Sequence, residues 1–326
     1  MTVKAFVSRQ LPESALAIAR EAAEIEVWSE VGPPPPHALA ERVAGCDGLL
    51  CLLTDRIDER LLDRAPRLRV VSQMAVGYDN IDVAACTRRG IAVGNTPGVL
   101  TETTADLAFA LLLAAARRVT EAERWLRAGE WKTWSPMQLT GPDVHHATLG
   151  IVGMGRIGRE MARRAAGFEM KILYHNRVRD EDAERRFGAE WRSLDDLLAE
   201  SDFVSLHTPL SAETRHLIGA RELAKMKQTA VLINTARGAV IDQAALADAL
   251  SRGVIAAAGL DVFEFEPLPL GDPLLSLPNV VLLPHIGSAS IATRTKMAIL
   301  AAENLAAGLR GKPLPHPVNV PAKPGG

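Results

Sequence analysis

The 326-residue sequence has few aromatic side chains and almost no excess charge. With only 7 Phe, 5 Trp and 2 Tyr, a core must be filled mainly by Ala, Val, Leu and Ile. The 37 Lys and Arg residues against 39 Asp and Glu give a net charge of −2, so no strong field is available to hold nucleic acid or an anionic membrane. The longest apolar stretch, 107–116, is far shorter than the ~20 residues that cross a bilayer. We therefore expect neither nucleic acid nor a membrane as a partner.

Cysteine is scarce as well. Cys46, Cys51 and Cys86 are odd in number and lack the spacing of metal ligands. The first residues, MTVKAFVSRQ, do not have the basic-then-apolar pattern of a signal peptide, which favours reduced thiols and a cytoplasmic location. His145 and His146 are adjacent in a predicted loop and cannot easily converge on one ion. We therefore expect no metal site.

What the sequence does contain is an alternation of short β-branched runs with helical segments. This alternation predicts an α/β fold with parallel sheets, and the length suggests two domains. A first series of elements ends near residue 94, and a second series opens at Thr148. Between them, 101–118 reads as an almost wholly apolar helix, which we expect to be buried on every side and to form a spine between the domains. The strands expected in the second series are 148–152, 171–175, 203–206, 230–234, 256–260 and 280–283.

A glycine-rich segment between a predicted strand and a predicted helix, GIVGMGRIG at 150–158, matches the pattern G-x-G-x-x-G. Gly153 would permit a tight turn, Gly155 would let the backbone approach a pyrophosphate, and Gly158 would let the helix pack closely on the strand. Free amides at the helix start, at Arg156 and Ile157, would hold the phosphates with the help of the helix dipole. The segment predicts a dinucleotide site.

The residues after the next strand bear on which dinucleotide is bound. An NAD site expects an acidic residue there, but the sequence has Asn176, followed by Arg177 and Arg179. The missing carboxylate removes repulsion toward a 2′-phosphate, and a guanidinium can bind that phosphate with two hydrogen bonds. A solvated loop arginine is the alternative interpretation. We expect NADP(H) to be preferred, with NAD(H) possible.

Three further clusters follow predicted strands of the second series: NTARG with Arg237, GLDVFEFEP with Glu266, and LPHIGS with His285. Taken singly, these residues could be a strand-end ion pair, a solvated turn acid and a loop histidine. Together, at the edge where open α/β sheets bind ligands, they are the minimum set for reducing a 2-keto acid. The arginine would polarise the carbonyl, the histidine would deliver a proton, and the carboxylate would orient the histidine.

The same motifs carry a family resemblance. The sequence resembles the D-isomer-specific 2-hydroxyacid dehydrogenases. The motifs that carry the resemblance are GMGRIG, SDFVSLHTPLSAETRHLI, MKQTAVLINTARGAVID, AAGLDVFEFEP and LPHIGS within 149–288, and VGYDNID at 76–82. WKTWSP at 131–136 and LLCLLTDRID at 49–58 are similar to the glyoxylate/hydroxypyruvate reductase branch. The resemblance implies a reductase that converts glyoxylate and hydroxypyruvate to glycolate and D-glycerate, and Asn176 with Arg177 makes NADPH its expected hydride donor.

The resemblance also implies the architecture: two Rossmann-like, doubly wound parallel-sheet domains with a cleft between them. Residues 1–100 with 289–326 would form the substrate domain, and 101–288 the dinucleotide-binding domain. Family members are usually homodimers, and the arm at 117–142, with two tryptophans and little internal periodicity, suits an exchanged dimer contact.

Individual roles follow from the resemblance. The backbone amides of Val76 and Gly77 would cradle the substrate carboxylate, with Leu53 and Ser288 at the substrate. Trp134 would enter the partner subunit's active site, or else dock at a dimer interface. The residues expected near the nicotinamide or elsewhere along the cofactor are Thr104, His207, Thr208, Pro209, Thr214, Thr235, Ala236, Asp261 and Gly287.

Other functions remain open at this stage. Another D-2-hydroxyacid dehydrogenase or a phosphite dehydrogenase would use a similar Arg, Glu and His. Formate enzymes usually carry a Gln–His pair where this chain has Glu266 and His285, and this difference counts against formate oxidation. A dinucleotide-sensing, corepressor-like binding protein would need an altered active site or long disordered extensions.

Overall fold

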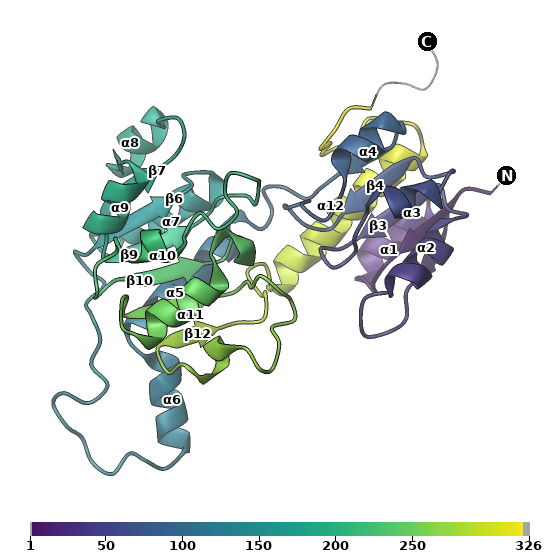
Figure 1. The fold of residues 1–326 in the computed structure, drawn as a ribbon. Coiled ribbons are helices and arrows are strands. Elements are labelled where there is room, and N and C mark those ends of the chain that lie inside the picture. The colour runs from purple at the N-terminus through teal and green to yellow at the C-terminus, as the bar shows by residue number, and fades with distance from the viewer. Residues whose placement is uncertain (1, 322–326) are drawn as a thin grey trace. The chain divides into compact units, whose positions relative to one another are not determined.

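Short segments of two to five residues, most of them apolar, form two separate parallel sheets. Parallel sheets are covered on both faces, which suits strands that do not alternate polar with apolar residues. The computed structural model describes residues 2–321, and the chain divides into two compact units (Figure 1). One unit contains the residues up to Leu100 and the segment that starts at Ala289, and the other runs from Thr101 to Ser288. Across residues 2–321, no helix is both long and apolar enough to cross a membrane.

The first unit is built on a five-stranded parallel sheet with the order β2-β1-β3-β4-β5. Its strands are β1 (Lys4–Val7), β2 (Glu24–Val27), β3 (Gly48–Cys51), β4 (Val70–Gln73) and β5 (Ala92–Gly94). Its helices are α1 (Glu13–Arg20), α2 (Pro36–Val43), α3 (Glu59–Asp63), α4 (Val83–Arg88) and α12 (Ile291–Leu309). Side chains of α2, α3 and α4 pack in one apolar cluster, and those of α1 and α12 in another. The three cysteines are unpaired, buried members of the first cluster.

The second unit is built on a seven-stranded parallel sheet with the order β12-β11-β10-β9-β6-β7-β8. Its strands are β6 (Thr148–Val152), β7 (Lys171–His175), β8 (Glu190–Trp191), β9 (Phe203–Leu206), β10 (Val231–Asn234), β11 (Ala257–Leu260) and β12 (Val280–Leu282). The chain builds outward from β6 through β7 to β8, then returns to the other side of β6 with β9. This reversal is a topological switch point, where open α/β sheets bind their ligands. Both parallel sheets confirm the expected fold class.

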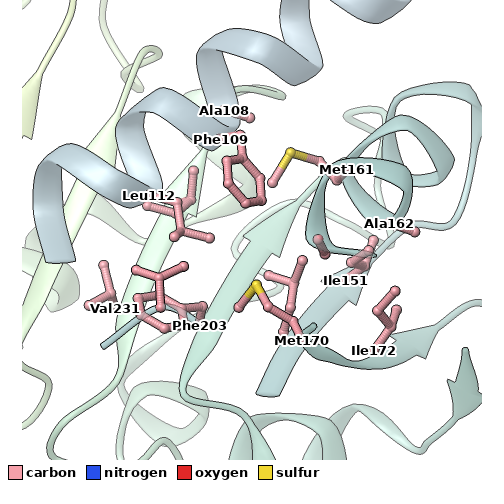
Figure 2. Packing of buried hydrophobic residues seen from close by; sticks show 14 of the residues in the cluster. Ala108, Phe109, Leu112, Ile151, Met161, Ala162, Met170, Ile172, Phe203 and Val231 are labelled. Atoms are coloured by element: carbon pink, nitrogen blue, oxygen red, sulfur yellow. The ribbon is translucent and has the colours of Figure 1, made fainter. Parts of the chain in front are cut away.

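Helices cover both faces of this second sheet. The helices of the second unit are α5 (Thr101–Ala116), α6 (Val119–Arg127), α7 (Arg156–Ala166), α8 (Glu181–Phe187), α9 (Leu194–Glu200), α10 (Ala220–Leu223) and α11 (Gln243–Ser251), with 3₁₀ turns η1 (Gly238–Val240) and η2 (Pro273–Ser276). Figure 2 shows Phe109 and Leu112 of α5 and Met161 of α7 above Ile151 of β6. Side chains of α9, α10 and α11 form the opposite cluster. The glycine-rich segment at 150–158 therefore connects a buried strand to a helix with a buried face.

The apolar helix α5 is not buried on every side, so that expectation is wrong. Glu102, Asp106 and Ala110 are exposed, and the helix ends at Ala116 rather than at residue 118. It packs against β10, β11 and α7, all in its own unit. The mostly apolar composition concealed this stripe, in which two acidic residues and one alanine follow one another at a spacing of four residues and so share one face of the helix.

The arm at 117–142 contains an element that the sequence analysis did not anticipate. Helix α6 occupies 119–127 and buries none of its residues, and together with the following loop it extends away from the sheet (Figure 1). The two-residue edge strand β8 was also missed. Both lack the long apolar period by which buried elements are recognised.

Candidate active site

The glycine loop after β6 has the backbone that a phosphate site requires. Gly153 has φ +101°, in the left-handed region, and a Cβ there would lie 2.8 Å from the carbonyl carbon of His207. A Cβ at Gly158 would lie 2.3 Å from the carbonyl oxygen of Gly153, so a side chain fits at neither position. Gly155, the N-cap of α7, has no side chain to cap the first turn, and a Cβ there would meet nothing within 4 Å. The amides of Arg156, Ile157 and Gly158 are therefore left for a ligand.

Asn176, at the end of β7, holds the glycine loop in place. Its Oδ1 accepts a hydrogen bond of 2.8 Å from the backbone amide of Met154. Because this amide lies inside the loop, Asn176 contributes to the loop's shape as well as replacing an acid. The sequence pattern gave no sign of this second role.

The two arginines after β7 differ in their surroundings. Arg177 is exposed and makes no hydrogen bond or ion pair among the described residues, although its charge helps to lower the pKa of Glu213. Arg179 donates hydrogen bonds of 3.0 and 2.8 Å to the two carboxylate oxygens of Glu184. A phosphate would have to compete with Glu184 for Arg179, so Arg177 is the better candidate for a 2′-phosphate.

Two buried hydroxyl groups at the ends of β9 and β10 lack partners. The Oγ1 atoms of Thr208 and Thr235 have no hydrogen-bond partner in the part of the chain that the structure describes. An unsatisfied buried hydroxyl costs about 1–3 kcal/mol, so both positions fit a polar ligand at this edge. Together with the open space at Gly155, they match the needs of a bound dinucleotide.

Other predicted cofactor residues after β9 and β10 are engaged within the protein. The ring Nε2 of His207 lies 2.8 Å from Ser205 Oγ, and burial lowers the pKa of His207 to about 3, so the ring is neutral. Thr214 Oγ1 donates to the Pro209 carbonyl at 2.6 Å. Ala236 donates its amide to Asn234 Oδ1 at 3.0 Å. These contacts shape the loops on which any cofactor contact would depend.

Asp261, after β11, organises the loop that carries His285. The Asp261 side chain is 1% exposed, and its two carboxylate oxygens accept hydrogen bonds of 2.7 Å each from the amides of Ile286 and Gly287. The amide of His285 donates to the Asp261 carbonyl at 2.9 Å. Burial raises the pKa of Asp261 above its ordinary value, although the amide of Ile286 and the nearby His285 oppose the shift. A Cβ at Gly287 would lie 3.1 Å from Asp261 Oδ2 and 3.5 Å from Thr104 Cγ2, so Thr104 is close to this loop.

The structure brings the predicted acid–base residues together. His285 Nδ1 lies 2.7 Å from Glu266 Oε2, and Glu266 Oε1 accepts a 3.0 Å hydrogen bond from the Phe263 amide. Burial alone would raise the pKa of Glu266, but the hydrogen bond and charge of His285 outweigh it, and the pKa lies below its usual value. With Nδ1 held by Glu266, the ring presents Nε2 as its second proton site. His285 adopts φ +55°, a strained backbone of the kind that occurs at functional sites.

Arg237 joins this pair through close backbone packing. It follows β10, and its Nη1 donates to the Ala236 carbonyl at 2.8 Å. A Cβ at Gly238 would lie 1.8 Å from the carbonyl carbon of Phe263, so only glycine lets the loop that carries Glu266 come this close. The positive charge of Arg237 contributes to the lowered pKa of Glu266. A fixed cation, a carboxylate and an imidazole are thus assembled in the second unit.

Further side chains hold the loop of Glu266 through contacts with Glu264. His216 Nε2 lies 2.5 Å from Glu264 Oε1, and Gln243 Oε1 accepts the Glu264 amide at 3.0 Å. Gln243 Nε2 in turn donates to Asp272 at 2.6 Å. The sequence analysis missed the roles of Gln243 and Glu264, because contacts across 21 and 48 residues leave no local pattern.

The remaining predicted substrate residues are distributed over both units. Val76 and Gly77 follow β4, and Leu53 follows the neighbouring strand β3, all in the first unit. Ser288 is the last residue of the second unit and is half-buried. Trp134 lies in the loop after α6 and is 75% exposed, so within its own chain it is not part of a packed site.

Comparison with known proteins decides the family. A model of the "D-isomer specific 2-hydroxyacid dehydrogenase, NAD binding domain" matches residues 109–287. A glyoxylate reductase of Korarchaeum cryptofilum is 57% identical over 320 residues, which cover 98% of this chain and 96% of that protein. The chain belongs to the D-isomer-specific 2-hydroxyacid dehydrogenase family. The resemblance inferred from the motifs is thereby confirmed.

Solved structures agree with this membership. A crystal structure of a Thermus thermophilus protein has a TM-score of 0.91 at 48% identity and covers 97% of this chain and 100% of that one. An NADPH-dependent glyoxylate/hydroxypyruvate reductase from Sinorhizobium meliloti, in complex with NADP and malonate, has a TM-score of 0.85 at 35% identity and covers 98% of this chain and 97% of that one. As a D-2-hydroxyacid dehydrogenase, the protein is an oxidoreductase that binds a nicotinamide dinucleotide.

The lowered pKa of Glu266 predicts a pH-dependent stability. A carboxylate whose pKa is lower in the folded state stabilises that state above its ordinary pKa of 4.5, and the contribution is lost as the pH falls through the folded value. We expect the melting temperature of Glu266→Gln to fall less than that of the wild type between about pH 5 and pH 3. Scanning calorimetry across this range measures the difference. Glu24→Gln, an exposed glutamate of β2, is the control, and parallel curves for wild type and Glu266→Gln would contradict the prediction.

Proposed function

We propose that the protein reduces glyoxylate and hydroxypyruvate to glycolate and D-glycerate, with NADPH as the preferred hydride donor. The observation that carries the proposal is the 2.7 Å contact between His285 Nδ1 and Glu266 Oε2, in a loop packed next to Arg237. The names of the relatives from Korarchaeum cryptofilum and Sinorhizobium meliloti support the substrate class.

In the proposed reaction the chain's own groups bind the 2-keto acid and manage its charge. The amides of Val76 and Gly77 bind the carboxylate, with Leu53 and Ser288 lining the substrate. The Arg237 guanidinium polarises the keto oxygen, because a fixed cation stabilises the negative charge that develops there. These contacts favour a small 2-keto acid over a simple ketone.

His285 acts as the general acid. Its Nε2 donates a proton to the keto oxygen as the carbonyl carbon is reduced, which turns C=O into CH–OH. Glu266 keeps the ring oriented through Nδ1 and compensates the charge of the protonated imidazole. The bound nicotinamide dinucleotide supplies the hydride. The residues proposed to hold it are the glycine-loop amides, Thr208, Thr235 and, near the nicotinamide, Thr104 and Asp261.

A spectrophotometric panel with the His285→Ala variant tests the reaction. We expect the wild type to oxidise NADPH, followed at 340 nm, with glyoxylate and hydroxypyruvate, and His285→Ala to lose about 10²–10⁴-fold in kcat, the range for a positioned acid. His145→Ala, a histidine exposed in a loop, serves as the matched control. Turnover of phosphite with NADP⁺ but of neither keto acid, or unchanged kcat in His285→Ala, would contradict the proposal.

Preference for NADPH is assigned to Arg177, with Asn176 in place of an acid. Arg177 is the exposed guanidinium after β7 that makes no hydrogen bond or ion pair in residues 2–321, so it can bind a 2′-phosphate with both terminal nitrogens.

Substitution of Arg177 separates the two coenzymes. We expect Arg177→Ala to raise KM for NADPH about tenfold or more, because a charge-assisted contact is lost, and to leave KM for NADH within about twofold. Arg185→Ala on α8 is the control, since Arg185 is an exposed arginine that pairs with Glu181. Equal changes in both KM values would show that Arg177 does not contact the phosphate.

The arm at 117–142 supports a homodimer as the working form. Val119, Leu126, Trp131, Trp134 and Met137 are all at least half-exposed in this one segment, and α6 buries no residue in its own chain. So large an apolar set in one segment is typical of a surface that another copy covers.

Light scattering after gel filtration tests the dimer. We expect a molar mass of twice the 35.0 kDa of the chain, and a shift toward the monomer in Leu126→Asp, because a charge in an apolar interface is unfavourable.

Trp134→Ala distinguishes the two roles proposed for Trp134. A higher KM for glyoxylate at unchanged molar mass indicates a place in the partner's active site, whereas a lower molar mass indicates an interface contact. Leu270→Ala is the control for both substitutions, because Leu270 is 97% exposed and lies outside the arm at 117–142. A monomeric wild type would contradict the proposal.

A further inference from the structure

In the loop after β4, three consecutive carbonyl groups, those of Ala75, Val76 and Gly77, accept hydrogen bonds from the protein. The hydrogen bonds are Thr96 N to Ala75 O at 2.9 Å, Asn95 Nδ2 to Val76 O at 2.8 Å and Gln73 Nε2 to Gly77 O at 3.2 Å. Two of the three donors come from consecutive residues, Asn95 and Thr96, which follow β5. The loop is thus fixed from one side by a single short segment.

Holding the carbonyls also sets the direction of the amides. In a trans peptide group the C=O and the N–H point in opposite directions, so fixing Ala75 O orients the Val76 amide, and fixing Val76 O orients the Gly77 amide. Because both carbonyls face residues 95–96, both amides point away from that segment. Neither amide has an acceptor among residues 2–321, and Val76 and Gly77 are only partly buried. Two adjacent donors are therefore oriented in advance for an anion.

Asn95 is itself firmly anchored. Its carbonyl accepts a 2.9 Å hydrogen bond from Asn304 Nδ2, and its amide donates to the His316 carbonyl at 3.2 Å. The amide of His316 donates to Asn304 Oδ1 at 3.0 Å, which closes a ring of contacts. Asn304 lies on α12 and is 0% exposed. The side chain that holds Val76 is therefore braced by α12 and by the segment after it.

We infer that Asn95 is a positioning residue for the substrate carboxylate. Its side-chain amide fixes the Val76–Gly77 peptide group, so that the Gly77 amide meets the carboxylate without first having to be ordered. Donors that are ordered before binding strengthen the interaction because no reorganisation is needed. Gln73 fixes the following peptide group in the same way. The inference rests on the proposed function, which assigns the carboxylate to the Val76 and Gly77 amides.

Removing the side-chain amide tests the inference. We expect Asn95→Ala to raise KM for glyoxylate about tenfold, since a hydrogen bond to a charged group is weakened, and to leave KM for NADPH within about twofold. Asn279→Ala is the matched control, because Asn279 also donates to two backbone carbonyls, those of Leu250 at 3.3 Å and Ala256 at 3.0 Å, in the other unit. A merely structural role would change both KM values together or neither, and either result would overturn the inference.

A second variant keeps the test decisive if Asn95→Ala folds poorly. Asn95→Asp preserves the shape, but its ionised carboxylate only accepts hydrogen bonds and would repel Val76 O, whereas its protonated form can donate an O–H. We expect the ratio of KM for glyoxylate in Asn95→Asp to that in the wild type at the same pH to be well above one at about pH 8, and to fall toward one as the pH approaches about 4, the ordinary pKa of an aspartate. A ratio independent of pH would overturn the inference.

The outcomes also separate this inference from the proposed function. A wild type that reduces glyoxylate normally, with unaffected Asn95 variants, contradicts the positioning role alone. A wild type that reduces no 2-keto acid contradicts the proposed function, and the positioning role with it.

Discussion

Parallel strand pairing is the constraint on which both units depend. All carboxyl ends of a parallel sheet lie at one edge, so loops that leave neighbouring strands are neighbours in space however far apart they are in sequence. In the second unit, β6, β9, β10 and β11 are adjacent. The segment after β6 is the glycine loop, and those after the other three strands carry Thr208, Arg237 and Asp261. In the first unit, the adjacent strands β3 and β4 lead to Leu53 and to Val76. Each unit thus brings its candidate site residues to one edge of its sheet.

Buried or partly buried polar side chains shape the loops at these edges. Asp261 holds the amides of Ile286 and Gly287 and so fixes the loop of His285. In the first unit, the buried Asp55 accepts the Leu52 amide at 2.7 Å. Asn95 and Asn176 act on peptide groups of their own neighbouring loops. Burying such groups is unfavourable unless each is hydrogen-bonded, so each is stable in one arrangement, and that arrangement orients the backbone donors around it.

Periodicity and motif spacing predicted most of the fold and the central residues of the site. The strands of both sheets are short apolar runs with clear boundaries, and Arg237, Glu266 and His285 each stand in a distinct cluster after a strand. The failures have a common origin. Three elements were mispredicted or missed: the exposed stripe of α5, the helix α6, which has no buried residue, and the edge strand β8. Whether their side chains are buried depends on which other elements pack against them. The sequence analysis also missed the ion pair between Arg179 and Glu184, which forms because α8 places the Glu184 carboxylate beside the Arg179 guanidinium.

By itself the sequence determined the parallel-sheet fold class, most of the elements along the chain and the candidate site residues, because these follow from local periodicity and residue type. Only the tertiary structure decided which of those groups are engaged and which are left for a ligand. Glu266 meets His285 across 19 residues, Gln243 supports Glu264 across 21, and Asn304 braces Asn95 across 209. Hydrogen bonds over such separations form only when packed strands and helices bring their partners within reach, and no local pattern along the chain encodes them.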